Sequence, residues 1–143
     1  MDGEKEGSMN EEKIDTTEKI TININTIDLG YIDLLVSEGY YSTRTDFIKT
    51  SIKMQLEKHE EETKRLIKQK ENSDCQLIVG IGGMTRKDLE TAISENKKMK
   101  IVHVGLFFLA KDVSLELFEQ VVESIKVYGV SRCSKEIKDK YGI

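Results

Sequence analysis

The sequence predicts an α+β protein with two folded units. Residues 19–25 alternate strictly between polar side chains and isoleucine, which is the pattern of a strand with one apolar face. Two stretches with helical spacing follow it. Residues 74–143 contain two apolar runs, each followed by helical spacing, which predicts a small β-α-β-α-α unit. We therefore expect an N-terminal strand with two helices, followed by this smaller C-terminal unit.

The strand predicted over residues 19–25 cannot be stable alone. Ile20, Ile22 and Ile24 would form its apolar face, and no second strand of the same chain lies nearby in the sequence. A lone strand leaves its apolar face and its backbone groups in water, so we expect it to pair with a second copy. Two antiparallel copies would form a two-stranded ribbon in an intertwined dimer, with polar side chains on the opposite face.

Two helices are predicted directly after this strand. Thr26 or Asp28 can cap the first helix, and Gly39 can end it. Thr43 can cap the second helix, with Asp46 three residues later in the manner of a capping box. Apolar residues recur at helical spacing in both segments and would face the dimer. The predicted dimer core consists of Ile20, Ile22, Ile24, Leu35, Phe47, Ile48 and Ile52.

The C-terminal unit is predicted to contain two strands, over residues 75–81 and 100–110, with Gly82-Gly83 ending the first. Helical spacing follows each strand, and a short last helix starts at Ser134. The predicted helices cover residues 86–96, 115–127 and 135–141. A two-stranded sheet is small for an independent core, so we expect this unit to join its sheet to that of another copy.

Composition divides the chain into four segments. The predicted segments are a disordered acidic N-terminus (1–17), the strand and two helices (18–58), a charged helical extension or linker (59–73), and the C-terminal unit (74–143). Residues 1–12 hold one lysine and five acidic residues, a composition typical of disorder. The net charge of −4 argues against a protein that coats nucleic acid non-specifically.

Several classes of protein are disfavoured. No apolar run approaches the roughly 20 residues of a membrane span, and no signal-peptide pattern is present. We therefore expect a cytoplasmic protein without membrane contact, in which Cys75 and Cys133 are free thiols. Gly80-Ile81-Gly82-Gly83 lacks the third glycine of a dinucleotide loop. His59 and His103 have no metal-ligand spacing with either cysteine. We predict no catalytic residues, no metal site and no cofactor.

Three motifs together resemble a known family. They are K-I-T-I-N-I-N at residues 19–25, I-D-L-L-V-S-E-G-Y-Y at 32–41 and S-T-R-T-D-F-I-K-T-S-I at 42–52. Over residues 18–58 their order and spacing resemble the ribbon-helix-helix transcription factors of the CopG/Arc/MetJ type. Thr43-Arg44-Thr45-Asp46 stands where that family's signature reads S-R-S-E. The resemblance implies a homodimer that inserts its ribbon into the major groove of a double-stranded DNA operator, in the manner of a repressor.

The resemblance also implies roles for individual residues. Lys19, Thr21 and Asn23 would read bases, and they are the side chains that project opposite the isoleucines. The major groove admits a two-stranded ribbon and can be read by such side chains. The start of the second helix would hold a phosphate, because free backbone N–H groups and the helix dipole favour an anion there. The residues predicted to anchor phosphate are Asn25, Thr43, Arg44 and Thr45.

Simpler interpretations stay open for these residues. Thr21 and Asn23 could be the solvated face of a strand. Thr43 would cap a helix whether or not DNA is present. Arg44 could pair only with a surface carboxylate, and the lysines of the second helix are more often solvated than bound to phosphate.

The role of the C-terminal unit stays open as well. I-G-G-M-T-R-K-D-L-E and V-E-S-I-K-V-Y-G-V-S-R-C-S-K-E-I-K-D resemble a domain appended to some ribbon-helix-helix regulators, for which no ligand is implied. Residues 74–143 could oligomerise, giving a tetramer, or sense an effector. An alternative for the whole chain is an antitoxin-like module that neutralises a partner protein and regulates its own promoter.

Overall fold

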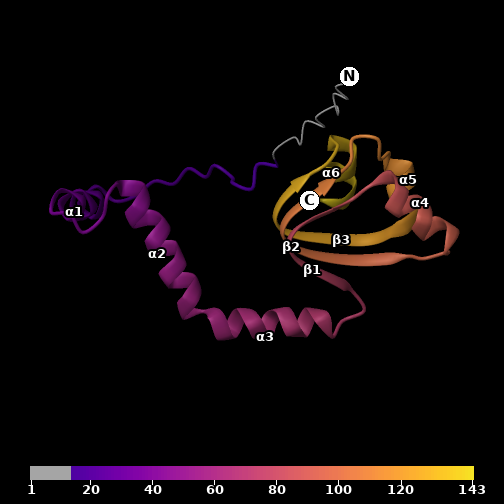
Figure 1. Cartoon of the computed structure of the whole chain (residues 1–143), viewed down its shortest axis with the longest axis horizontal. Helices are drawn as coiled ribbons and strands as arrows, with labels where there is room; N and C mark the ends of the chain where they lie inside the picture. Colours follow the sequence, from indigo (N-terminus) through magenta and orange to yellow (C-terminus); the bar gives the residue numbers. More distant parts are fainter. Residues whose placement is uncertain (1–13) are drawn as a thin grey trace, which may run out of the picture.

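A computed structural model describes residues 14–143. Most of the N-terminal segment that we expected to be disordered, residues 1–13, lies outside the described residues. Residues 14–25 have no regular secondary structure and lead to three successive helices, which return the chain to a separate C-terminal sheet (Figure 1). Across the described residues, no helix combines the length and the apolar character needed to cross a membrane.

The first helix, α1, spans Thr26–Ser37. Its N-cap is Asn25, whose side-chain oxygen accepts a hydrogen bond of 2.8 Å from the backbone N–H of Ile27. The prediction of Thr26 or Asp28 as the cap was therefore wrong by one or more residues. Asn25 is favoured because its backbone is non-helical and its short amide reaches an otherwise unpaired N–H.

The turn between the first two helices follows the prediction closely. Gly39 has a φ of +82° directly after α1, a conformation that suits glycine at a helix end. The second helix, α2, spans Arg44–Lys58, and the Thr43 hydroxyl accepts a 3.0 Å hydrogen bond from the N–H of Asp46. The Asp46 carboxylate accepts from the N–H of Ser42 at 3.0 Å, so it closes the turn one residue before the position expected for a capping box.

A third helix, α3, spans Glu60–Glu71. It is separated from α2 by His59, whose backbone leaves the helical geometry. The imidazole of His59 lies between the two helices, with Nε2 at 3.3 Å from the Gln55 amide nitrogen and Nδ1 at 2.9 Å from a Glu62 oxygen. The charged stretch after α2 is therefore helical, but it is a distinct helix.

The C-terminal part consists of three β-α units. Its strands are β1 (Gln76–Met84), β2 (Met99–Leu109) and β3 (Val122–Arg132), and its helices are α4 (Arg86–Ser94), α5 (Leu115–Val121) and α6 (Lys135–Tyr141). The strands are all parallel and lie in the order β1-β2-β3. Successive right-handed crossovers in one direction place the connecting helices on one face of a sheet, and Figure 1 shows α4, α5 and α6 gathered on one side.

The predicted β-α-β-α-α order was wrong, because a third strand replaces half of a predicted helix. We expected a helix over residues 115–127, but α5 ends at Val121 and β3 begins at Val122. This segment is rich in β-branched residues, which favour strands. Gly129 lies within β3. The first strand also continues through Gly82 and Gly83, which pair with β2.

One face of the sheet packs against the three helices. Phe118 of α5 is fully buried, and its ring meets that of Tyr141 edge to face at 5.1 Å. The Tyr141 hydroxyl donates a 2.7 Å hydrogen bond to the carbonyl of Val122, which joins α6 to the start of β3. The buried cluster consists of Leu89, Ala92, Ile101, Phe107, Leu109, Val113, Phe118, Val121, Val122, Ile125 and Ile137.

Three glycines, one on each strand, are paired across the sheet, and we call them the glycine row. Gly80 pairs with Gly105, and Gly105 pairs with Gly129. Their φ values are +113°, +131° and +123°, in a region that other residues rarely adopt. A Cβ on Gly105 would overlap the carbonyl oxygen of Gly80. That oxygen lies 3.0 Å from Nε2 of the fully buried His103, whose Nδ1 has no hydrogen-bond partner among the described residues.

Candidate nucleic-acid interface

The three predicted base-reading side chains lie on the segment that precedes α1. Lys19, Thr21 and Asn23 are all exposed. Within residues 14–143, none of them makes a hydrogen bond or an ion pair. They therefore present their donors and acceptors to solvent, and no strand within residues 14–143 pairs with this segment.

The isoleucines of the same segment are also exposed. Ile20, Ile22 and Ile24 retain 72%, 62% and 38% of their accessible surface. Exposure of three consecutive members of one alternating stripe is unfavourable, because it leaves a continuous apolar surface in water. The helices behave similarly, since in residues 14–73 only Ile32 is buried.

The remaining members of the predicted dimer core are partly covered. Leu35, Phe47 and Ile48 are half-buried between α1 and α2, whereas Ile52 is 47% exposed. The ring of Tyr41 meets that of Phe47 edge to face at 4.9 Å. The contact between α1 and α2 therefore covers one side of these side chains and leaves the rest of the apolar stripe open.

The start of α2 combines three of the predicted phosphate-anchoring residues. Thr43 uses its hydroxyl oxygen as the helix cap. Arg44 and Thr45 follow in the first turn, where backbone N–H groups have no partner within the helix. Asn25, the fourth predicted residue, caps α1, so its side-chain oxygen is engaged and only its NH₂ group can donate to a phosphate.

Arg44 makes a two-pronged ion pair that the sequence analysis did not locate. Its Nε and Nη2 lie 2.7 Å and 2.8 Å from the two carboxylate oxygens of Asp33 on α1. The hydrogen bond from Arg44 lowers the pKa of Asp33, and the same bond raises the pKa of Arg44. Asp33 was missed because it lies eleven residues away and reaches Arg44 only when the turn at Gly39 brings the two helices together.

The residues weighed as metal ligands are dispersed over the fold. His59 lies between α2 and α3, and His103 is enclosed in the sheet. Cys75 and Cys133 are free and partly buried, and burial raises the pKa of the Cys133 thiol. Residues 14–143 contain no group of three or more histidine, cysteine or acidic side chains that could hold a metal ion.

One known protein family matches most of the chain. The model of the Ribbon-Helix-Helix transcriptional regulator family matches residues 15–138. The chain belongs to this family. The match includes the C-terminal β-α units as well as the segment that precedes α1, so it extends well beyond the three motifs that carry the resemblance. Neither the search of curated proteins nor that of solved structures gave a match.

Proposed function

We propose that two copies of the chain form a DNA-binding transcriptional regulator, joined by an antiparallel ribbon of residues 19–25. The observation that carries the proposal is the pair of opposite faces on this segment. The isoleucine face is exposed at Ile20, Ile22 and Ile24, whereas the polar face has no partner among the described residues. Pairing would bury the first face in an intertwined dimer and leave the second free to enter the major groove.

The polar face has chemistry suited to reading bases. The Asn23 amide can bond to adenine with its donor and its acceptor at once, and Lys19 can donate to guanine. Thr21 can donate a hydrogen bond or contact the methyl group of thymine. Each side chain occurs twice in the dimer, so the preferred operator is a palindrome whose half-sites follow the two-fold axis.

Phosphate contacts from the start of α2 would fix how deeply the ribbon enters the major groove. The helix dipole and the free N–H groups of the first turn would stabilise a phosphate beside Thr45. Arg44 can assist while it remains bound to Asp33, since Nη1 is not used in that ion pair. Asn25 and Thr43 add side-chain donors beside the ribbon. Such contacts fix the position of the protein without selecting sequence.

Substitutions on the ribbon test the assignment. The operator is first identified by selecting bound sites from random DNA. The protein's affinity for this operator should then fall by about 1–3 kcal/mol in each of Lys19→Ala, Thr21→Ala and Asn23→Ala. Binding to unrelated DNA should change far less, and the dimer should remain folded. Lys98→Ala, an exposed lysine in the C-terminal part, is the matched control. Unchanged operator affinity in all three ribbon variants would refute the proposed readout.

We further propose that binding represses transcription. A dimer seated in the major groove occupies DNA that other proteins would need to approach. In a transcription assay with purified polymerase, the protein should reduce transcript from a promoter that overlaps the operator. It should have no effect when the operator is scrambled. Increased transcript would reverse this part of the proposal.

The C-terminal sheet is proposed to join dimers into a tetramer along its β1 edge. Charged residues protect sheet edges from pairing, and β1 contains none, whereas β3 carries Glu123, Lys126 and Arg132. Val79→Lys in β1 should reduce a tetramer to a dimer in light scattering. Ser124→Lys in β3 is the matched control and should leave the mass unchanged. A wild-type protein that is only dimeric at high concentration would contradict this proposal.

A further inference from the structure

The face of the sheet opposite the helices, which we call the outer face, is apolar but only partly covered. It is defined by alternate residues of the three strands, including Val79, Ile81, Val104, Leu106, Tyr128 and Val130. Purely parallel sheets are normally covered on both faces, yet Val79, Ile81 and Tyr128 are 59%, 56% and 43% exposed. The outer face is therefore open to water at these three side chains, although Leu106 on the same face is covered.

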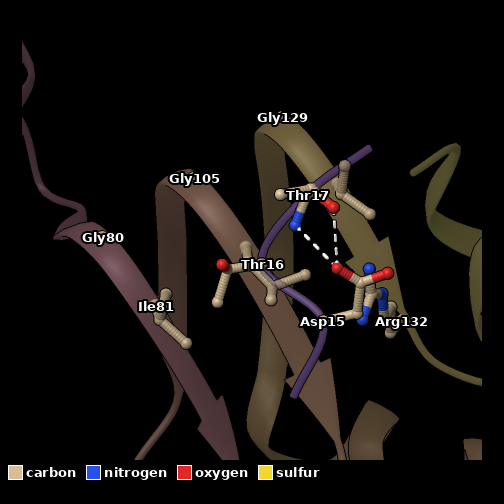
Figure 2. Close-up of a pocket in the computed structure, with 10 residues that line it drawn as sticks. Asp15, Thr16, Thr17, Gly80, Ile81, Gly105, Gly129 and Arg132 are labelled. Atoms are coloured by element: carbon tan, nitrogen blue, oxygen red, sulfur yellow. Dashed lines mark hydrogen bonds between the residues drawn. The ribbon is translucent and has the colours of Figure 1, made fainter. Parts of the chain in front are cut away.

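The N-terminal arm, defined as residues 14–17, lies over this face. Figure 2 shows residues 15–17 crossing the strands beside the glycine row, with the side chain of Asp15 close to Arg132. A cavity of about 270 Å³ separates the arm from the sheet, and it is lined by all three glycines of the row. Leu106, beside the row, is only 7% exposed. Glycine is required in the row because a Cβ on Gly105 or Gly129 would overlap a carbonyl oxygen of the neighbouring strand.

Two hydrogen bonds within the arm join Asp15 to Thr17. The Asp15 carboxylate accepts hydrogen bonds from the N–H of Thr17 at 3.0 Å and from its hydroxyl at 2.8 Å. These bonds lower the pKa of Asp15, and the positive charge of Arg132 acts in the same direction. Among the described residues that line the cavity, Arg132 is the one with a cationic side chain, and its charge favours the ionised form of the Asp15 carboxylate.

We propose that the outer face is the docking surface of the N-terminal arm of the same chain, with Asp15 directed to Arg132, and that this contact holds the ribbon segment to the C-terminal sheet. Only Glu18 separates the arm from the ribbon residues. The helix α3 reaches the same face from the other end of the DNA-binding part, where the Lys70 Nζ lies 5.2 Å from the ring centroid of Tyr128. Both chain connections therefore converge on one surface.

The consequence is a path by which the C-terminal sheet controls the ribbon. Any molecule that occupies the outer face beside the glycine row must displace the arm, and displacement frees the residues that precede the ribbon. The docking contact itself does not depend on the proposed DNA binding. Its effect on the operator does rest on that function.

The docking contact can be tested without DNA, using the full chain. The amide signals of Gly80, Gly105 and Gly129 in a two-dimensional NMR spectrum report on the surface beneath the arm. Asp15→Lys should shift these signals, because it places two positive charges together and releases the arm. Glu18→Lys makes the same charge change one residue beyond the arm and should leave the signals in place.

A charge exchange and a motional measurement complete the test. Adding Arg132→Glu to Asp15→Lys should return the glycine signals toward their wild-type positions. Relaxation of α1 amides should show faster independent motion in Asp15→Lys than in Glu18→Lys. Glycine signals that are identical in all variants would overturn the docking. Shifted glycine signals with unchanged α1 motion would overturn the coupling to the ribbon. Neither the glycine signals nor the α1 motion depends on operator binding. A failure of the proposed DNA binding can therefore be told apart from a failure of the docking.

Discussion

The N-terminal part of the chain, residues 14–58, and the C-terminal part, residues 74–143, place their apolar side chains in opposite ways. In the first part only Ile32 is buried, and Ile20 keeps 72% of its surface exposed. In the second part, three helices close over the sheet and remove Phe118 completely from solvent. In both parts, apolar residues recur at the regular spacing of helices or strands. The parts differ in where the surface that covers these residues lies, which is within the chain for the C-terminal part and, as proposed, in a second copy for the N-terminal part.

This difference separates two sources of stability. The C-terminal cluster is made by contacts within one chain, so this core should stay packed on dilution even when the proposed tetramer dissociates. The N-terminal stripe lacks a complete set of partners within residues 14–143 and is proposed to find them in a second copy. A structure that is completed by association gains stability with concentration. The two parts should therefore respond differently to dilution and to substitution.

Ile22→Asp should have the largest effect, and it should be confined to the N-terminal part. A carboxylate at the centre of the ribbon cannot be buried unpaired, so we expect complete loss of the dimer and of ordered α1 and α2. The C-terminal sheet should keep its NMR spectrum. Sedimentation measures the loss, and Ile22→Val, which preserves the apolar face, is the control. A variant that remains dimeric through residues 19–25 would contradict the ribbon.

Phe118→Ala should destabilise the other part, by about 3–5 kcal/mol, because it leaves a cavity among the helices and the sheet. Urea unfolding followed by a C-terminal signal measures the change, which should be the same at low and high protein concentration. Gln120→Ala, on the exposed side of the same helix, should have little effect. A loss of stability on Phe118→Ala that itself varies with protein concentration would show that the packing of the C-terminal core also depends on association.

Asp33→Asn should have the smallest effect and a defined pH dependence. The ion pair with Arg44 lowers the pKa of Asp33 in the folded chain below its ordinary value of 3.8. A lowered folded-state pKa stabilises the fold above the unfolded pKa, and this contribution is lost as the pH falls through the folded pKa. Wild type should therefore exceed the variant slightly in stability near pH 7, and the difference should vanish at strongly acidic pH. An equal difference at both pH values would mean that the ion pair is not responsible.

Local signals in the sequence predicted much of the N-terminal part. The glycine at position 39 and the hydroxyl of Thr43 mark the end of one helix and the start of the next, and both predictions are confirmed. These features involve neighbouring residues, so they can be inferred from short stretches. The ion pair between Asp33 and Arg44 could not be inferred, because it needs the angle at which α1 and α2 meet.

The C-terminal part was harder to predict because its strands pair over long separations. The segment after Leu115 satisfies helical spacing as far as Ile125, but the residues after Val121 are extended and pair with the neighbouring strand β2. One signal could have located this strand. Gly105 and Gly129 follow Gly80 at intervals of 25 and 24 residues, which is the spacing of a β-α repeat.

The sequence alone determined the alternation of isoleucine with polar residues, the cap of α2 at Thr43 and the membership of the family, because these depend on neighbouring residues and their order. Only the tertiary structure decided that three strands form the sheet, that one face remains partly uncovered, and that Asp15 and Arg132 line one cavity beside the glycine row. The physical reason is that such contacts join residues distant in the chain. Their geometry follows from packing and from the approach of backbones, and no short stretch of sequence specifies it.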